Sequence, residues 1–479
     1  MKKIILPLLL MLFTACPAYC STYYLDPNGN DTTGNGSKVL PWKTITQALT
    51  GIAAGDTIYL RGGRYLYTER VSISSSKSGN SGARINLLAD TNDANRPILD
   101  FSALAYDGTN RGITMSGSYW YMKGFDIYKA GDNGMNISGS NNIIEFCAFY
   151  ENYDSGLQLS GGAANNQFIN CDSYYNYDPP DGGDADGFAP KLDVGTGNYF
   201  YGCRAWQDSD DAYDGYLRGA DDVTTTYENC WAFKAGYLKD GSAGSGNGNG
   251  FKMGGGDNSN SANLKHNVVM NNCLAFQNLK KGFDQNNNKG SMTLYNCTAF
   301  SNGTYNYSIP LALVTGKTAK LTNCVGFTGS NNLGAFVVQT TNSWMPPFVV
   351  TSADFVSIDP SAAYGPRNAD GSLPDITFMH LAAGSDLIDH GTDVNLPYHG
   401  SAPDLGYFEY GGCTTPAVSD LNSDCEVDLF DYALLVNAWA DGLPDADLHN
   451  DGFLDLLDIA QFANDWLSCN RDPASECWQ

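Results

Sequence analysis

Three short segments in the middle of the chain carry the residues best suited to chemistry. Asp184-Ala185-Asp186-Gly187-Phe188 comes first, a run from Asp208 to Asp214 adds four more aspartates, and Asn249-Gly250-Phe251-Lys252 follows. Carboxylates that converge repel one another, and a bound cation or a raised pKa resolves the repulsion. An all-oxygen ligand set suits a hard ion, and Ca²⁺ accepts it in flexible geometry. A lysine beside such a cation could serve as a general base.

Ordinary structural roles are the alternatives for the same residues. Aspartates in Asp-Gly and Asp-Asp loops are often turn residues on a solvated edge, and a surface position is the default for a lysine. Lys252 also follows Asn249 by three residues, so the two would point to opposite faces of a straight strand. A shared site therefore requires a bend at Gly250.

A repeat must position these segments. Seven cysteines share one local context, because each is followed three residues later by an aromatic residue: Cys147, Cys171, Cys203, Cys230, Cys273, Cys297 and Cys324. A period of roughly 20 to 30 residues with short β-rich runs is typical of a solenoid. We therefore predict an all-β fold, a right-handed parallel β-helix, with these cysteines in a buried ladder rather than acting as ligands or nucleophiles.

A glycine followed by an apolar residue gives a second register. It occurs at Gly156-Leu157, Gly187-Phe188, Gly215-Tyr216, Gly250-Phe251 and Gly282-Phe283. The glycine stands nine residues after the ladder cysteine in the first and last pairs and farther away in the three between. This spacing predicts inserted loops in three adjacent coils, on the face where a solenoid usually binds ligands. It also predicts equivalent places for Asp186 and Asp214 in successive coils.

Composition limits the partners. The 479 residues carry a formal charge of −25, which disfavours nucleic acid and anionic membrane surfaces unless a cation intervenes. Only 16% of the residues are charged, whereas 53 are glycine, a balance that suits turns and stacked strands better than amphipathic helices. An all-α protein is therefore not expected.

The N-terminus predicts export. Residues 1–20 read as a signal peptide, with Lys2 and Lys3 ahead of an apolar run that is too short to span a bilayer. Cleavage before Ser21 fits better than a lipoprotein site at Cys16. No later stretch has the length of a transmembrane span. We expect a secreted protein, with a β-helix domain over residues 21–412 and a separate module over 413–479.

The C-terminal module contains two sets of carboxylates with the same spacing. They are Asp420, Asn422, Asp424, Asp428 and Asp431, and then Asp447, His449, Asp451, Asp455 and Asp458. The residues occupy positions 1, 3, 5, 9 and 12 of an EF-hand-like Ca²⁺ loop, and the position 7 carbonyls would come from Glu426 and Phe453. Each loop leads into an apolar helix, which an acidic disordered tail would not do.

The three central segments, in this order, resemble the signature of polysaccharide lyase family 9, the β-helical pectate lyases. The resemblance implies Ca²⁺ held by Asp186, Asp210, Asp211 and Asp214 and by the carbonyl of Ala212, with Lys252 as the base. It implies β-elimination on pectate, an acidic polysaccharide, with removal of the C5 proton, 4,5-unsaturated products and activity that rises toward alkaline pH. Candidates for contacts with substrate are Lys191, Arg204, Asn249 and Lys281.

Two other functions stay open. One is a β-helical lyase or hydrolase acting on another uronic-acid polysaccharide, and the other is a non-catalytic carbohydrate-binding surface protein. The Gly-His-Gly and Arg-x-Lys segments of β-helical polygalacturonases are absent from the sequence, and its five histidines are scattered without zinc-ligand spacing. Lys252 separates a lyase from a binder, because only the lyase needs it.

The C-terminal pair of loop-helix units resembles a dockerin. The resemblance implies docking to a cohesin-like partner on a scaffold or cell surface. His449 departs from the usual Asp or Asn, and Leu429-Phe430 and Leu456-Leu457 stand where small hydroxyl residues often set partner choice. The sequence therefore leaves the partner open, together with the pairing of Cys413, Cys425, Cys469 and Cys477.

Overall fold

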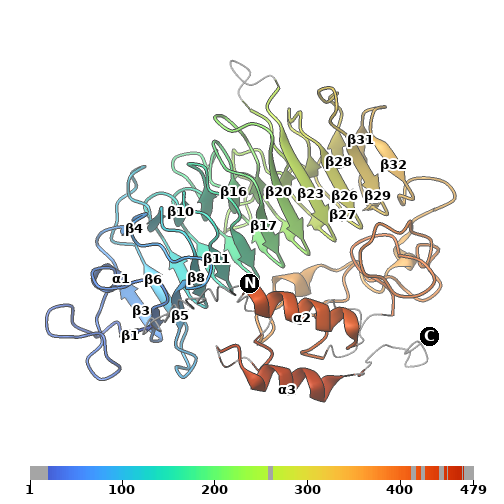
Figure 1. Cartoon of the computed structure of the whole chain (residues 1–479). Helices are drawn as coiled ribbons and strands as arrows, with labels where there is room; N and C mark the ends of the chain where they lie inside the picture. The colour runs from blue at the N-terminus through green and yellow to red at the C-terminus, as the bar shows by residue number, and fades with distance from the viewer. Residues whose placement is uncertain are drawn as a thin grey trace, which may run out of the picture.

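The computed structural model describes residues 20–256, 263–411, 417–421, 427–441, 447–449, 451, 453–466 and 468 (Figure 1). Its main body is a solenoid whose strands form three parallel sheets, here named A, B and C. Residues 1–19 of the predicted signal peptide and the four C-terminal cysteines lie outside the described residues. None of the described helices is long and apolar enough to cross a membrane.

Successive coils of the solenoid contribute, in chain order, one strand to sheet A, one to sheet B and one to sheet C, and sheet A has one additional strand at each end. Sheet A contains β1 (Thr22–Leu25), β2 (Thr57–Leu60), β5 (Ile85–Ala89), β8 (Trp120–Lys123), β11 (Ile143–Glu145), β14 (Gln167–Ile169), β17 (Asn198–Tyr201), β20 (Val223–Glu228), β23 (His266–Asn271), β26 (Met292–Tyr295), β29 (Ala319–Thr322) and β32 (Val338–Thr340).

Sheet B contains β3 (Gly63–Leu66), β6 (Pro97–Asp100), β9 (Asp126–Tyr128), β12 (Ala148–Tyr150), β15 (Asp172–Tyr174), β18 (Arg204–Trp206), β21 (Trp231–Phe233), β24 (Leu274–Phe276), β27 (Thr298–Phe300) and β30 (Val325–Phe327). Sheet C contains β4 (Val71–Ile73), β7 (Ile113–Met115), β10 (Met135–Ile137), β13 (Leu157–Leu159), β16 (Phe188–Pro190), β19 (Tyr213–Asp214), β22 (Phe251–Lys252), β25 (Lys281–Asp284), β28 (Tyr305–Ile309) and β31 (Asn332–Leu333).

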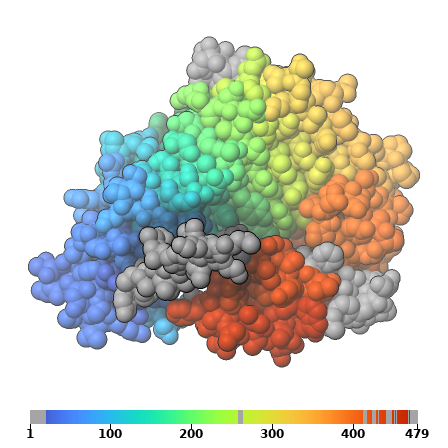
Figure 2. All heavy atoms as spheres, viewed as in Figure 1, coloured from blue at the N-terminus to red at the C-terminus, as the bar shows by residue number. Residues whose placement is uncertain are grey.

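Every strand pairs in parallel with the equivalent strand of the next coil, as in β13 with β16 and β18 with β21. This confirms the predicted parallel β-helix. Figure 2 shows the same order on the surface, where blue, green and yellow segments follow one another along the solenoid. A short helix, α1 (Ile45–Ala48), lies between β1 and β2 in the chain, and it buries Ile45 and Ala48.

The cysteine ladder lies at the corner between sheets A and B. All seven predicted ladder cysteines are buried free thiols. Each follows a residue in the left-handed backbone region: Phe146, Asn170, Gly202, Asn229, Asn272, Asn296 or Asn323. Asparagine and glycine tolerate that region best, which explains why one of them precedes six of the seven cysteines. The corner turns sharply, and the small thiol packs inward between neighbouring coils.

We predict that these thiols are inert in the folded protein. Each of the seven cysteines is at most 2% exposed, so a reagent in solvent has no access to the thiols, and reactive cysteines are typically partly exposed. An aromatic disulfide reagent should therefore leave the seven ladder thiols unmodified until denaturant unfolds the chain, when all seven should react. Reaction of several ladder thiols under native conditions would contradict the buried ladder.

The aromatic residues three places after the cysteines form an outer ladder on sheet B. Neighbouring rings of Tyr150, Tyr174, Trp206, Phe233 and Phe276 stack with centroids 4.3 to 5.5 Å apart. A C-terminal segment of the solenoid covers this ladder, and it buries Phe355, Phe378 and Leu381 against Trp206, Phe233 and Phe276. The segment includes two 3-10 turns, at Ser352–Asp354 and Ser361–Tyr364.

The strand register of sheet C corrects one prediction. Phe188 pairs with Tyr213, and Tyr213 pairs with Phe251. The equivalent of Gly187 is therefore Ala212 rather than Gly215, so Asp186 aligns with Asp211 and not with Asp214. The side chain of Ala212 is small enough for this position. Because the sequence pattern was defined by glycine, it did not include an alanine. Ala212 follows Cys203 by nine residues, so that coil has no insertion and only its two neighbours carry inserted loops.

The C-terminal residues form two helices outside the solenoid, α2 (Leu429–Asp441) and α3 (Leu456–Asp465) (Figure 1). A small apolar cluster joins them, and it buries Val427, Leu435, Ala438, Leu448 and Phe462. The two helices therefore pack as one unit with its own core, as the repeated apolar faces predicted.

Candidate active site

The candidate site lies on the outer face of sheet C, where two rows of polar side chains run across neighbouring coils. The first row occupies the residue two before each strand's aligned aromatic or leucine: Ser155, Asp186, Asp211, Asn249 and Lys281. The second row lies within the strands and is polar except at Ala189: Gln158, Ala189, Asp214, Lys252 and Asp284. The rows approach each other because the chain turns at Gly156, Gly187, Ala212 and Gly250, just before the strands that follow them.

This turn removes the difficulty raised by the spacing of Asn249 and Lys252. Strand β22 contains only Phe251 and Lys252, so Asn249 and Gly250 precede it. The backbone N–H and Nδ2 of Asn249 donate to Asp211 Oδ1, both at 2.8 Å, and Lys252 Nζ lies 3.0 Å from Asp211 Oδ2. Both residues thus hold the same carboxylate, from two sides.

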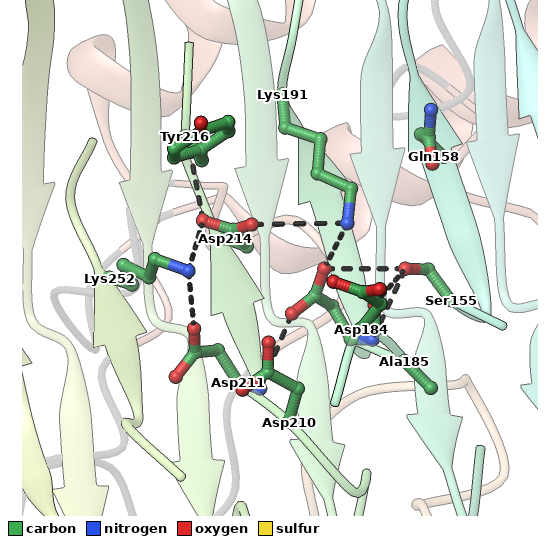
Figure 3. Close-up of polar contacts among 12 residues, drawn as sticks. Ser155, Gln158, Asp184, Ala185, Lys191, Asp210, Asp211, Asp214, Tyr216 and Lys252 are labelled. Carbon is green, nitrogen blue, oxygen red and sulfur yellow. Dashed lines mark hydrogen bonds and ion pairs between the residues drawn. The ribbon is translucent and has the colours of Figure 1, made fainter. Parts of the chain in front are cut away.

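Three carboxylates converge at the centre of the two rows. One oxygen each from Asp186, Asp211 and Asp214 lies within 4.8 Å of the others, and all three residues are buried. Figure 3 shows Asp211 and Asp214 from this group. The fourth predicted ligand, Asp210, is also buried and accepts from Asn247 Nδ2 at 3.0 Å. The fifth, the carbonyl of Ala212, accepts the backbone N–H of Phe188 at 2.9 Å, which leaves it one further lone pair.

Two lysines face these carboxylates. Lys191 Nζ lies 2.6 Å from Asp186 Oδ2 and 3.9 Å from Asp214 Oδ2. Lys252 Nζ lies 3.4 Å from Asp214 Oδ1, and it stands 5.7 Å from the centre of the Tyr216 ring. Figure 3 shows the two lysines approaching Asp214 from neighbouring strands. The strand register could not predict the contact between Lys191 and Asp186, because Lys191 follows the last residue of β16.

The charges of the site do not balance. Four aspartates (Asp186, Asp210, Asp211 and Asp214) face two lysines (Lys191 and Lys252), so two negative charges remain when all are ionised. Burial raises the pKa of Asp186 to about 8, against the opposing effect of Lys191. Burial, followed by the charges of Asp211 and Asp186, raises the pKa of Asp210 to about 9. Burial also opposes protonation of Lys252, but the carboxylates outweigh it and raise its pKa well above the usual value.

The residues present fit a divalent cation. The donor set is all oxygen, which suits Ca²⁺, and a charge of +2 would neutralise the excess of the four carboxylates over the two lysines. A further oxygen beside the aspartates, Asn249 Oδ1, is buried without a hydrogen bond from the described residues. Buried acceptors of this kind normally have a partner, and a cation nearby is one way to provide it.

Three of the four predicted substrate contacts, Asn249, Lys281 and Lys191, lie in or beside the two rows. Lys281 aligns with Asn249 in the first row, and its Nζ bonds Asp284 Oδ1 at 2.9 Å with about a third of the side chain exposed. Lys191 is nearly buried between Asp186 and Asp214. Ser155 was missed by the sequence interpretation, although its hydroxyl lies 3.3 Å from Asp186 Oδ2. Only the strand register could have revealed it.

Arg204 does not belong to this site. It lies on sheet B, only 2% exposed, and makes a two-pronged ion pair with Asp172 at 2.8 and 2.9 Å. Its Nη1 donates to the carbonyls of Ala363 and Gly365 in the covering segment. The prediction of a substrate contact fails because Arg204 follows the ladder cysteine and its strand faces the covering segment, not sheet C.

We predict that Arg204→Met lowers stability and leaves catalysis unchanged. Removing one partner of a buried ion pair typically costs about 3–5 kcal/mol, and the lower end applies because Arg367 also bonds Asp172. Denaturant unfolding should report a loss of about 3 kcal/mol. A large fall in kcat/KM at a temperature where the variant is folded would contradict this assignment.

The two C-terminal loops show matching geometry at their last predicted ligand. Asp431 accepts the backbone N–H groups of Leu421 and Asp428 at 2.7 and 2.8 Å. Asp458 accepts those of His449 and Asp455 at 3.0 and 2.8 Å. Both aspartates are fully buried. Asp420, Asp447, Asp451 and Phe453 are among the described residues, whereas Asn422, Asp424 and Glu426 lie outside them.

Comparison with known proteins places the chain in a family. Residues 23–323 match the family described as the Pel9A-like right-handed beta helix region. The chain belongs to this Pel9A-like family. Pectate lyase L of Dickeya dadantii is 39% identical over 397 residues, which cover 81% of this chain and 90% of that protein. Pectate lyase L of Paenibacillus polymyxa is 39% identical over 77% of this chain and 83% of its own length.

Solved structures agree with the family assignment. The crystal structure of pectate lyase Pel9A superposes with a TM-score of 0.74 at 38% identity, and the match covers 81% of this chain and 96% of that one. A rhamnogalacturonan lyase superposes with a TM-score of 0.66 at 28% identity and covers 76% of this chain. This Pel9A-like chain is therefore an enzyme of the polysaccharide lyase class, and its two-row site lies on the matched solenoid.

Proposed function

We propose that the chain is a secreted, Ca²⁺-dependent pectate lyase that cleaves α-1,4-linked galacturonan by β-elimination. One observation carries the proposal: Lys252 Nζ is nearly buried, and it lies 3.0 Å from Asp211 and 3.4 Å from Asp214 within a cluster of carboxylates. A buried lysine needs acidic partners to stay charged, and a cation held by the same carboxylates would offset their charge and lower the pKa of Lys252, so that Nζ could act as a neutral base.

Lys252 acts as the base. In its neutral form, Nζ takes the proton from C5 of a galacturonosyl unit, and the C–H electron pair becomes the C4=C5 double bond. The C4–O4 bond breaks, and the departing O4 takes up a proton. The product is a 4,5-unsaturated sugar at the new non-reducing end. Lys252 then returns its proton to solvent, so the residue is unchanged at the end of a cycle.

Asp186, Asp210, Asp211 and Asp214, with the Ala212 carbonyl, would hold Ca²⁺. When bound, the ion would neutralise the C6 carboxylate of the sugar and acidify its C5 proton. Asn249 keeps Asp211 oriented through two hydrogen bonds to one oxygen, which frees the other oxygen toward Lys252. Lys191 and Lys281 would bind carboxylates of neighbouring sugar units.

Absorbance of unsaturated uronate provides the test. Mixing the purified chain with polygalacturonate should produce a rise that depends on Ca²⁺ and stops on chelation. Mass spectrometry should find products that are one water lighter than hydrolysis would give. No rise with Ca²⁺ would refute the pectate lyase proposal. Products with the mass of saturated, hydrolysed oligogalacturonates would favour a hydrolase.

A lyase acting on rhamnogalacturonan is the second candidate. The superposed rhamnogalacturonan lyase, with 97% of its chain covered, favours it. Both polymers contain galacturonic acid, so the same base and cation could serve. Comparing kcat/KM on polygalacturonate and on rhamnogalacturonan under one set of conditions separates the two candidates.

For the C-terminal helices we propose a dockerin-like module with one Ca²⁺ in each loop, which docks to a cohesin-like partner. The matched contacts of Asp431 and Asp458 support two equivalent loops. Both helices also expose large apolar side chains, among them Leu429, Tyr432, Leu456 and Ile459. An exposed apolar surface of this kind on a small unit is typical of a protein interface.

Calorimetric titration of the full-length protein tests the two loops. We expect one Ca²⁺ in the groove and one in each loop, with the loop sites lost in the double variant Asp431→Asn/Asp458→Asn. Catalysis should be unchanged in that variant, because the groove is intact. Equal Ca²⁺ stoichiometry in the variant and in the parent protein would refute the loop sites.

A further inference from the structure

A buried histidine lies beneath the exit of the strand that carries Asp214. His266, the first residue of β23, is fully buried. Its Nδ1 lies 2.7 Å from the carbonyl oxygen of Gly215, and its Nε2 lies 2.8 Å from Thr225 Oγ1. A carbonyl oxygen can only accept, so in a neutral ring Nδ1 carries the proton and Nε2 accepts from the Thr225 hydroxyl. Burial lowers the pKa of His266, which favours the neutral ring.

The peptide group that His266 holds also holds Asp214. The Gly215 carbonyl and the Tyr216 N–H belong to one peptide group, and this N–H donates to Asp214 Oδ1 at 2.9 Å (Figure 3). A peptide group is planar, with its C=O and N–H on opposite sides. A bond that fixes the carbonyl therefore also fixes the N–H and the carboxylate bound to it.

The same chain of contacts reaches Lys252. Asp214 Oδ1 lies 3.4 Å from Lys252 Nζ, and the backbone N–H of Gly215 donates to the carbonyl of Lys252 at 2.8 Å. The fit beside the ring is close, because a Cβ at position 215 would lie 2.9 Å from His266 Nδ1. The backbone between Asp214 and Tyr216 thus has little freedom while His266 is in place.

A second buried side chain extends this support to the other strand. Asn288 Nδ2 donates to the carbonyl of Met253 at 2.9 Å and to that of His266 at 2.8 Å. Met253 directly follows Lys252. His266 and Asn288 together therefore fix the backbone just beyond Asp214 and just beyond Lys252.

We propose that His266 is a positioning residue of the active site, which orients the Asp214 carboxylate through the peptide group of Gly215 and Tyr216. The inference depends on the proposed function, in which Asp214 is a Ca²⁺ ligand. Partners that orient a metal ligand typically change metal affinity or activity 10- to 100-fold when they are removed. His266→Phe keeps a ring of similar size and removes both nitrogens, so the Kd for Ca²⁺ should rise about 10- to 100-fold.

Calorimetric titration of the full-length protein with Ca²⁺ tests this proposal, with the C-terminal loops silenced by Asp431→Asn/Asp458→Asn in every sample. His266→Asn places an amide N–H near the position of Nδ1 and should recover most of the lost affinity. His266→Phe should add no further loss to Asp214→Asn, because the effect passes through that carboxylate. Kinetics on polygalacturonate should show the same order among the variants.

A second variant keeps the test informative if His266→Phe does not fold. Gly215→Ala leaves His266 in the chain but pushes a methyl group against its ring, and it should also weaken Ca²⁺ binding about tenfold or more. Gly51→Ala is the matched control, because a Cβ at that position meets nothing within 4 Å. Its Ca²⁺ affinity should equal that of the parent protein.

Three results would overturn the positioning role. They are unchanged Ca²⁺ affinity in folded His266→Phe, equal losses in His266→Phe and His266→Asn, and losses that add fully in the double variant with Asp214→Asn. Each would mean that His266 only fills space. Absence of groove Ca²⁺ binding in the parent protein would instead refute the proposed metal site, so the two failures can be told apart.

Discussion

Replacing Lys252 by methionine is expected to lower kcat on polygalacturonate by about 10²- to 10⁴-fold, the usual contribution of a positioned general base. Methionine has nearly the same length and apolar stem as lysine, so it preserves the packing under Tyr216 and removes only the amine. The loss should appear in kcat rather than in KM, because the amine takes the proton in the transition state. Initial rates of unsaturated-uronate formation over a range of substrate concentrations provide the measurement.

Lys281→Met is the matched control for this experiment. Lys281 lies in the neighbouring coil and in the other row, and its Nζ bonds Asp284 rather than the three central carboxylates. Its loss should raise KM and leave kcat close to that of the parent protein. Retained kcat in Lys252→Met would remove Lys252 from the role of base, and a fall in kcat of similar size in both variants would point to a general charge effect.

Asp211→Asn is expected to raise the Kd of the groove for Ca²⁺ by more than about 100-fold, and chelation is expected to abolish the activity of the parent protein. Asp211 contributes one of the three converging carboxylates, and the charge and number of the ligands determine Ca²⁺ affinity. Ca²⁺ binds the groove only when it is folded. With the C-terminal loops silenced by Asp431→Asn/Asp458→Asn in every sample, Ca²⁺ at 100 times the Kd of the groove should therefore stabilise the protein by about 2.7 kcal/mol. Asp211→Asn should lose this stabilisation, measured as the Ca²⁺-dependent shift in thermal unfolding.

Asp208→Asn is the control for the metal experiment. Asp208 is also buried and lies three residues away, but its Oδ1 accepts from the side chain of Asn176 at 2.7 Å. It occupies a rung of an asparagine ladder, in which Asn152 donates to Asn176 at 2.9 Å. Asparagine should fit this rung, so Ca²⁺ affinity should be unchanged. Equal losses in the two variants would show that any buried charge in this coil matters, rather than a specific ligand.

The charge of −25 acquires a more specific meaning from this geometry. An acidic groove would repel an acidic polysaccharide, and the two uncompensated negative charges of the site increase that repulsion. Binding of polygalacturonate, and not only its cleavage, should therefore require Ca²⁺.

The sequence alone determined the solenoid and the segments that form its site. Ladder residues recur at every coil because identical backbone corners need the same small or left-handed residues, so Cys147 to Cys324 reveal the fold without any distant contact. The motif from Asp184 to Lys252 revealed the acidic cluster for the same reason, since neighbouring coils bring equivalent positions together.

Only the tertiary structure decided how the side chains meet. Pairing of Tyr213 with Phe188 aligned Asp186 with Asp211, because strand pairing rather than a glycine sets the register when loops of different length intervene. It placed Arg204 on sheet B against the covering segment and brought Lys191 and Ser155 to Asp186. It also placed His266 below Gly215, 51 residues away. Such contacts depend on where each coil turns, and local residue patterns do not encode those turns.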